Sequence, residues 1–231
     1  MASNTSKHLF TKTPTLIDVV DTSDLFCVHR IYCVGQNYRK HVLEMGGDPD
    51  RESPFFFSKP ADSISRQPQI KYPSLTNNLH HEVECVVALG SGGRDITTDE
   101  ANAHIFGYAV GVDLTRRDLQ AEAKTKGRPW DVAKGFDQSA PISSIIKAKS
   151  FTTSICQISL SVNNETRQQG YLEQMIWNIP ELISELSRYY ELQAGDLIFT
   201  GTPDGVGQVL PGDVIECQLG KQLHHQFEMI A

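Results

Sequence analysis

The clearest alternation of hydrophobic and polar residues lies at residues 79–90 (LHHEVECVVALG) and predicts a β-strand. Successive side chains of a strand point to opposite faces, so the segment divides into two sets. One face would hold His81, Val83, Cys85 and Val87, and the other His80, Glu82, Glu84 and Val86. Because the second face continues as apolar residues at Val86 and Ala88, we expect both faces of this strand to be covered.

Residues 108–114 (YAVGVDL) predict a second strand, whose two faces differ in side-chain size. Bulky side chains occupy one set of alternate positions. The other set holds Ala109, Gly111 and Asp113, so one acidic residue stands beside two small ones. Asp113 is therefore a candidate functional residue.

Shorter patterns complete an outline that is rich in strands. Further strands are predicted at residues 30–35, 51–60 (which contain FFFSKP), 196–202 and 213–218. Helices are predicted at residues 36–46, 97–106, 116–126 (with Thr115 as N-cap and Gly127 as its end) and 180–190. Residues 1–24 are polar and predict an irregular segment, whereas residues 25–231 predict a single strand-rich domain with a few helices.

Composition excludes several classes of protein. The 231 residues carry 21 Lys and Arg against 28 Asp and Glu, a formal net charge of -7, and no basic block. Nucleic acid and anionic membrane surfaces are therefore not expected partners. The sequence has no apolar run near the roughly 18 residues of a membrane span. We expect a cytoplasmic protein, because the N-terminal residues lack the features of a targeting peptide. The five cysteines are scattered and predict reduced thiols.

Glu82 and Glu84 form the first candidate site. Hard divalent cations prefer several oxygen ligands, and carboxylates two residues apart on a strand converge on one side. Asp113 could supply a third ligand. An oxygen-only set suits Mg²⁺ or Mn²⁺ better than Zn²⁺. The alternative is that both glutamates face solvent on an edge strand, although the apolar continuation of their face argues against it.

His41 and Glu44 lie three residues apart in the predicted helix at 36–46. This spacing places them on one helical face, where a carboxylate could orient an imidazole that acts as a base. An ordinary exposed His–Glu pair is the alternative. Lys134, in the segment AKGF, and the helix residues Arg117 and Gln120 could contact a substrate anion, or could simply lie on a solvated surface.

Together these residues resemble the fumarylacetoacetate hydrolase family, and in particular its short single-domain members that act on acylpyruvates. The matching segments cover the chain in order from about residue 30. They are IYCVGQNYRKHVLEMG at 31–46, FFFSKPADSI at 55–64, LHHEVECVVALG at 79–90, GYAVGVDLTRRDLQAEAKTKGRPWDVAKGFDQSAP at 107–141 and LIFTGTPDGVG at 197–207.

The resemblance implies an α+β fold, a mixed β-sandwich roll with peripheral helices, and assembly as a homodimer. It implies that Mg²⁺ or Mn²⁺ is held by Glu82, Glu84 and Asp113, and that His41 and Glu44 belong to a lid helix. It further assigns catalytic or substrate-binding positions to Lys134, Arg117, Gln120 and Thr202.

The activity implied is hydrolysis of the C–C bond of 2,4-dioxo acids such as fumarylpyruvate, within the breakdown of aromatic compounds. The metal would act as a Lewis acid, His41 would activate water, and Lys134 would stabilise the developing negative charge. The distal carboxylate of fumarylpyruvate would need a partner, with Arg39, Arg66 and Arg128 as candidates. Decarboxylation of oxaloacetate, or tautomerisation of a 2-oxo acid, would use the same groups. A binding domain without activity is a further alternative.

Overall fold

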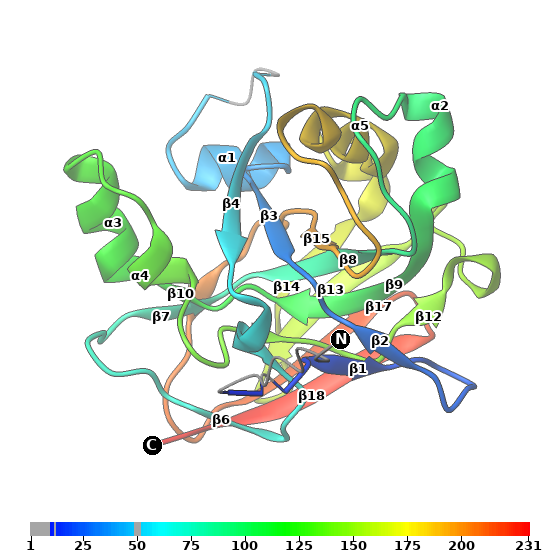
Figure 1. Cartoon of the computed structure of the whole chain (residues 1–231). Helices are drawn as coiled ribbons and strands as arrows, with labels where there is room; N and C mark the ends of the chain where they lie inside the picture. Colours follow the sequence, from blue (N-terminus) through cyan, green and yellow to red (C-terminus); the bar gives the residue numbers. More distant parts are fainter. Residues whose placement is uncertain (1–9, 12, 49–51) are drawn as a thin grey trace, which may run out of the picture.

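The computed structural model describes residues 10–11, 13–48 and 52–231, and its architecture rests on two sheets. The larger mixed sheet has the strand order β12-β9-β8-β15-β3-β4 (Figure 1). Its strands are β3 (Ile31–Gly35), β4 (Phe55–Lys59), β8 (Val83–Leu89), β9 (Ile105–Val112), β12 (Ile146–Lys147) and β15 (Leu197–Phe199). These strands confirm the predictions at residues 30–35, 79–90 and 108–114 in their main parts.

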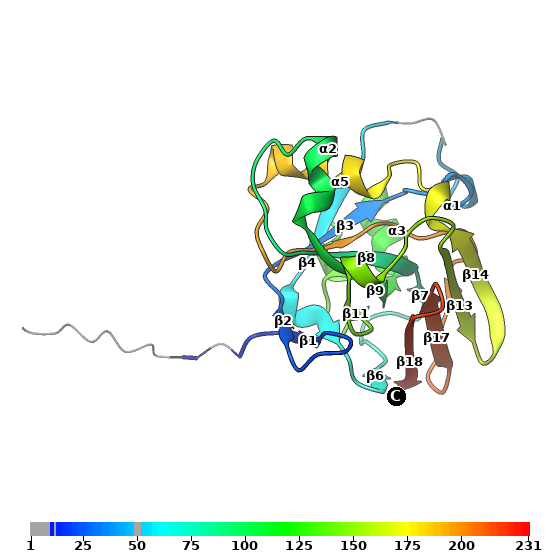
Figure 2. The same ribbon diagram turned by 90° about the vertical axis from the view of Figure 1, so that its right-hand side faces the viewer.

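The second sheet has the order β14-β13-β17-β18-β6 and contains the last strands of the chain (Figure 2). Its strands are β6 (Gln69–Lys71), β13 (Gln157–Val162), β14 (Glu165–Tyr171), β17 (Val214–Leu219) and β18 (Leu223–Ile230). Three smaller sheets pair β10 (Thr115–Arg116), β7 (Leu79–His81) and β16 (Gly207–Gln208); β1 (Leu16–Asp18) and β2 (Leu25–Cys27); and β11 (Ala140–Pro141) and β5 (Ile64–Ser65).

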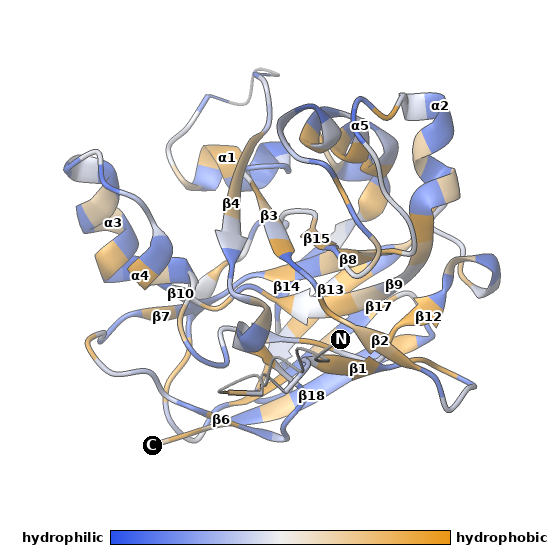
Figure 3. Cartoon of the chain, in the orientation of Figure 1, coloured by the Kyte–Doolittle hydropathy of each residue, from blue (hydrophilic) through white to orange (hydrophobic). Residues whose placement is uncertain are grey.

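Apolar residues cover both faces of β8, as its alternation predicts. Val83, Cys85 and Val87 belong to a core cluster that also contains residues of β13 and β17 from the second sheet. Val86 and Ala88 belong to another cluster on the opposite face. Figure 3 shows apolar residues distributed along these strands. Because β8 lies inside the sheet with both faces buried, the interpretation of Glu82 and Glu84 as residues of a solvent-facing edge strand is wrong.

Helices lie around the sheets. They are α1 (Arg39–Glu44), α2 (Thr98–Ala101), α3 (Arg117–Thr125), α4 (Asp131–Lys134) and α5 (Ile179–Tyr189), with short 3₁₀ helices at Ala61–Ser63, Asn102–His104, Ala148–Ser150 and Leu172–Gln174. A capping box between Thr97 and Glu100 begins α2, and Asn178 caps α5. In the described part of the chain, none of the helices is long and apolar enough to cross a membrane. Strands with few helices confirm the α+β class.

The structure corrects three local predictions. Residues 1–24 are not irregular throughout, because Leu16–Asp18 form β1 and Ile17 is fully buried; residues 1–9 and 12 lie outside the described part. The strand predicted at 79–90 is interrupted at Glu82. Thr115 does not cap α3, because it is paired in β10 and its hydroxyl donates a hydrogen bond to the carbonyl oxygen of Asp113. The five cysteines are free, as predicted.

Candidate metal and catalytic site

Three buried carboxylates meet where β7 gives way to β8 and where β9 ends. Glu82, Glu84 and Asp113 each place one oxygen within 4.8 Å of the others. Strand pairing brings them together: Glu84 lies opposite Gly111, and the backbone N–H of Asp113 donates a 2.8 Å hydrogen bond to the carbonyl oxygen of Glu82. The three predicted ligands therefore form one oxygen-only cluster, which is the donor set that hard divalent cations prefer.

Lys134, at the end of α4, contacts two of these carboxylates. Its Nζ donates hydrogen bonds to Glu82 Oε2 at 2.7 Å and to Asp113 Oδ2 at 2.6 Å. Burial lowers the pKa of Lys134, but the charges of Asp113 and Glu82 outweigh it and raise that pKa above its ordinary value. Burial likewise raises the pKa of Glu82, while Lys134 and Arg117 lower it by more. Lys134 and Glu82 are therefore both charged.

Glu84 has a different environment from Glu82. Its Oε2 accepts a 2.7 Å hydrogen bond from the backbone N–H of Gly201, and it belongs to none of the ion pairs among the described residues. Burial, followed by the charges of Asp113 and Glu82, holds the pKa of Glu84 well above its usual range. A divalent cation within the cluster would offset this repulsion. The donors present thus fit a divalent metal.

Arg117 and Gln120 stand one turn apart on α3 and reach the same cluster. Arg117 donates hydrogen bonds to Glu82 Oε1 and, at 2.6 Å, to Gln120 Oε1. Gln120 is buried although it lies on a peripheral helix. The structure therefore brings both predicted substrate-binding residues to the carboxylates, with donor groups beside Glu82.

His41 and Glu44 pair within α1 as predicted. The distance from His41 Nδ1 to Glu44 Oε2 is 3.2 Å, and His41 is buried. Glu44 also accepts a 3.1 Å hydrogen bond from the backbone N–H of Gly205, which attaches α1 to a turn far along the chain. Gly205 has a φ of +94°, and a Cβ at this position would lie 2.0 Å from the carbonyl oxygen of Arg167. Only glycine fits this turn.

Thr202 is held by a buried glutamine that sequence reasoning missed. The Nε2 of Gln168 donates a 2.8 Å hydrogen bond to Thr202 Oγ1. Its Oε1 accepts from the backbone N–H of Val83 at 3.0 Å and lies 2.9 Å from His81 Nδ1. Gln168 thus joins β14 to the start of β8 and to the turn at Thr202. The surrounding ETRQQGY is polar and gave no signal that this residue is buried.

Lys59 is a second residue beside the acidic cluster that sequence reasoning missed. It ends β4, is buried, and places Nζ 2.8 Å from Asp113 Oδ1. It also donates hydrogen bonds to the carbonyl oxygens of Leu114, Ser139 and Lys134. The sequence did contain a signal for this residue, because Lys59 ends the apolar run FFFSKP. A lysine that is buried with such a run needs an acidic partner.

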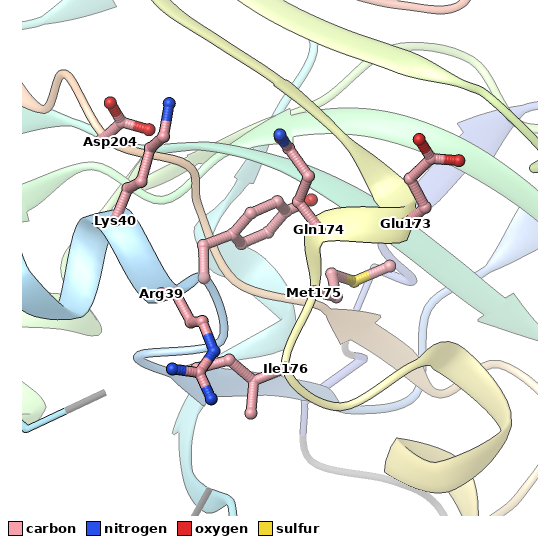
Figure 4. Close-up of a pocket in the computed structure, with 8 residues that line it drawn as sticks. Arg39, Lys40, Glu173, Gln174, Met175, Ile176 and Asp204 are labelled. Atoms are coloured by element: carbon pink, nitrogen blue, oxygen red, sulfur yellow. The ribbon is translucent and has the colours of Figure 1, made fainter. Parts of the chain in front are cut away.

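Eight of the nine predicted site residues line one cavity of about 30 Å³. The ninth, Glu44, contacts His41, which is one of the eight. The volume of this cavity is about that of one water molecule, so binding of a larger molecule requires the side chains to move apart. A larger cavity of about 520 Å³ lies beside α1 and is lined by Arg39, Lys40 and Asp204 among others (Figure 4). None of the nine predicted residues lines it, and the acidic cluster is absent from its walls.

Comparison with known proteins agrees with this geometry. A family model described as fumarylacetoacetate (FAA) hydrolase C-terminal matches residues 30–227. Fumarylpyruvate hydrolase from Ralstonia sp is 43% identical over 169 residues, which cover 73% of this chain and 88% of that protein. Oxaloacetate tautomerase YcgM from Escherichia coli is 45% identical over 190 residues, which cover 80% of this chain and 86% of that protein.

Among solved structures, fumarylpyruvate hydrolase from Pseudomonas aeruginosa, in complex with Mn²⁺ and pyruvate, superposes with a TM-score of 0.94. The two chains are 43% identical, and the match covers 97% of this chain and 99% of the other. The similarity therefore extends over the whole fold and includes the segments that carry the site.

Proposed function

The chain belongs to the FAA hydrolase family, and from this premise we propose that it hydrolyses the C3–C4 bond of acylpyruvates, with fumarylpyruvate as the substrate. The products are pyruvate and a carboxylic acid. One observation carries the proposal: the acidic cluster, Lys134 and the His41–Glu44 pair line or support the same cavity. The names of the Ralstonia and Pseudomonas relatives favour the same substrate.

Glu82, Glu84 and Asp113 would hold the divalent ion, which we propose to be Mg²⁺ or Mn²⁺. When bound, it supplies positive charge that stabilises the negative charge developing on the pyruvate half of the substrate. The oxygen-only ligand set supports Mg²⁺, and the Mn²⁺ in the Pseudomonas structure supports the second choice. Lys59, through its contact with Asp113, keeps one ligand in place.

His41 would act as the base. Glu44 occupies the Nδ1 side of the ring, which leaves Nε2 to accept a proton from the attacking water. The water oxygen bonds to C4, the C3–C4 bond breaks, and its electron pair passes to the pyruvate half. Transfer of that proton from His41 to C3 would then complete pyruvate. The Glu44 carboxylate stabilises the imidazolium while it holds the proton.

Lys134 and the neighbouring donors would bind the negative charge. Because Lys134 keeps its proton, it can offer an ammonium group to the oxygen that becomes anionic. Arg117 and Gln120 would bind the carboxylate of the pyruvate half, and Thr202, which lines the same cavity, would add a hydroxyl.

A second candidate is supported by the relative from E. coli, which is named an oxaloacetate tautomerase. Tautomerisation or decarboxylation of oxaloacetate needs stabilisation of the same enolate charge but no water. For such a reaction His41 would move a proton of the substrate rather than one from water.

Release of pyruvate tests the proposal. We would incubate the protein with fumarylpyruvate, acetylpyruvate and oxaloacetate, each with Mg²⁺, with Mn²⁺ and with a chelator, and identify the co-product. Metal-dependent formation of pyruvate and fumarate from fumarylpyruvate is the expected result. Turnover of oxaloacetate alone, as decarboxylation or as keto–enol conversion, would replace the hydrolase proposal with the second candidate.

We also propose a cytoplasmic homodimer that serves the breakdown of aromatic compounds. The family resemblance supports the dimer, and the proposed substrate supports the metabolic setting. Light scattering coupled to size-exclusion chromatography measures the number of subunits directly. A monomer at micromolar concentration would contradict the proposed homodimer.

A further inference from the structure

The α3 helix carries a third polar residue on the face that meets the cavity. Lys124 follows Arg117 by seven positions and Gln120 by four, a spacing that places all three on one side of a helix. Lys124 lines the same cavity as they do, yet it is accessible to solvent. It therefore stands at the mouth of the cavity, one turn beyond Gln120.

Among the residues that the structure describes, Lys124 differs from the other cations of the site because no carboxylate pairs with it. Lys134 and Arg117 pair with Glu82, and Lys59 pairs with Asp113. Within the described ranges Lys124 forms neither an ion pair nor a side-chain hydrogen bond. By contrast Lys126, two residues further along, pairs with Glu122. The charge of Lys124 is thus available to a ligand.

Aromatic side chains connect Lys124 to the reacting end of the cavity. The Nζ of Lys124 lies 5.1 Å from the ring centre of Trp130, whose ring centre is 5.7 Å from that of Phe57. The Nζ of Lys134 lies 5.0 Å from the Phe57 ring. Trp130 and Phe57 both line the cavity. A ligand there meets a charged end, then an apolar wall, then a second positive charge.

The three arginines considered from sequence lie elsewhere. Arg39 lines the larger cavity of Figure 4. Arg66 hydrogen-bonds to Asp18 and Ser144. Arg128 lines a neighbouring groove and approaches Glu122 at 3.9 Å. None of them lines the cavity that holds the acidic cluster.

We propose that Lys124 binds the terminal carboxylate of a dicarboxylic acylpyruvate and thereby selects such substrates over monocarboxylic ones. This inference rests on the proposed function and adds its specificity determinant. In fumarylpyruvate the terminal carboxyl carbon lies three carbons beyond the C4 carbonyl, and the intervening alkene is apolar. The order of groups in the substrate matches the order of cavity walls: metal ligands, aromatic rings, unpaired ammonium.

Binding of a matched pair of inert ligands tests Lys124 directly. We would measure by calorimetry, on the Mn²⁺-loaded protein, the affinity for 2-oxoheptanedioate and for 2-oxoheptanoate, which differ only in the terminal carboxylate. The wild type is expected to bind the diacid about tenfold more tightly. Lys124→Met should remove most of that difference and Lys124→Arg should keep most of it. Lys126→Met is the matched control and should leave the difference intact.

Two results would overturn the inference. Equal weakening of both ligands by Lys124→Met would mean that the lysine only packs against Trp130. Loss of the difference in Arg128→Met, with Lys124→Met unchanged, would move the carboxylate site to the neighbouring groove.

Kinetics separate this inference from the proposed function. Lys124→Met should lower kcat/KM for fumarylpyruvate about tenfold more than kcat/KM for acetylpyruvate. If the wild type cleaves neither acylpyruvate, the hydrolase proposal fails, and the ligand pair still decides whether Lys124 recognises a terminal carboxylate. If it cleaves both and Lys124→Met affects both equally, only the assignment of Lys124 fails.

Discussion

Two buried acidic side chains at opposite ends of β15 show how a structural carboxylate differs from a functional one. Asp196, just before β15, accepts hydrogen bonds from Arg30 at 2.7 and 3.0 Å and from the backbone N–H of Gln193, and contacts His29. Glu84 contacts the segment that follows β15, where Gly201 N–H donates its hydrogen bond. The first acid is neutralised by a matched cation, whereas the second shares its surroundings with two further carboxylates.

The difference teaches that burial alone does not identify a site. A buried carboxylate with a guanidinium partner stabilises the fold and needs nothing else. A cluster of three carboxylates, one of them without a cation, destabilises the folded state by charge repulsion. Such destabilising groups are concentrated at functional sites, where a bound ligand compensates for them. Predictions at both ends of β15 follow from this contrast.

The largest expected effect is on activity. Glu84→Gln removes the charge of a proposed metal ligand but keeps an oxygen that can accept from Gly201 N–H, so the fold should persist. We expect kcat/KM to fall about 10³-fold, equivalent to roughly 4 kcal/mol of transition-state stabilisation. Steady-state kinetics with saturating Mn²⁺, beside circular dichroism of both proteins, checks this. Wild-type activity in the variant would remove Glu84 from the site.

The opposite outcome is expected for Asp196→Asn. Loss of the carboxylate leaves Arg30 without its partner, and the free energy of unfolding should fall by about 2 kcal/mol because Arg30 is one-third exposed. Urea denaturation measures the loss. The variant's kcat/KM should match the wild type at a temperature where both are folded; a specific loss of activity would mean that the two ends of β15 are coupled.

Removing the charge of Glu44 should have an intermediate effect. In Glu44→Gln the imidazolium of His41 loses its stabilising carboxylate, so kcat should fall about tenfold. The chain offers a matched control in Glu216, which pairs with His224 at 3.0 Å on the surface. Glu216→Gln should leave kcat unchanged. Equal effects of both substitutions would assign no special role to the pair on α1.

The smallest effect concerns stability against pH without metal. The pKa of Glu84 is raised above its ordinary value of 4.5, so the folded state holds this proton more tightly than the unfolded state. Its contribution to stability is therefore present below pH 4.5 and is lost as the pH rises through the raised pKa. Relative to Glu84→Gln, the wild type in a chelator should lose stability as the pH rises from 4.5 to 7. A difference that does not change with pH would contradict the raised pKa.

The acidic cluster could be predicted from the sequence because strand alternation is a local property. The period of two places Glu82 and Glu84 on one face, and the apolar continuation at Val86 shows that this face is buried. The pairing of His41 with Glu44 is equally local. Lys134, Arg117 and Gln120 were candidates by residue type, and the family resemblance assigned their roles and added Thr202. All four line the same cavity.

Residues held by long-range contacts could not be derived in this way. The buried side chain of Gln168 accepts a hydrogen bond from Val83 at the start of β8, and the buried Lys59 pairs with Asp113, far along the chain. Threonine is a good N-cap by residue type, yet Thr115 pairs with β7 and belongs to strand β10 instead of capping α3. Tertiary contacts overrode local preference in each case.

The register between β8 and β9 has a consequence for how this chain can change over evolutionary time. Glu84 faces Gly111, where a Cβ would lie 2.7 Å from Phe199, so insertion or deletion of a residue in either strand would displace the carboxylates and their neighbours together. The site residues on α1 and α3 do not belong to either strand. The positions of the three carboxylates can therefore stay fixed during evolution while residues on the helices, and with them the substrate, change. Relatives named for hydrolysis and for tautomerisation illustrate this.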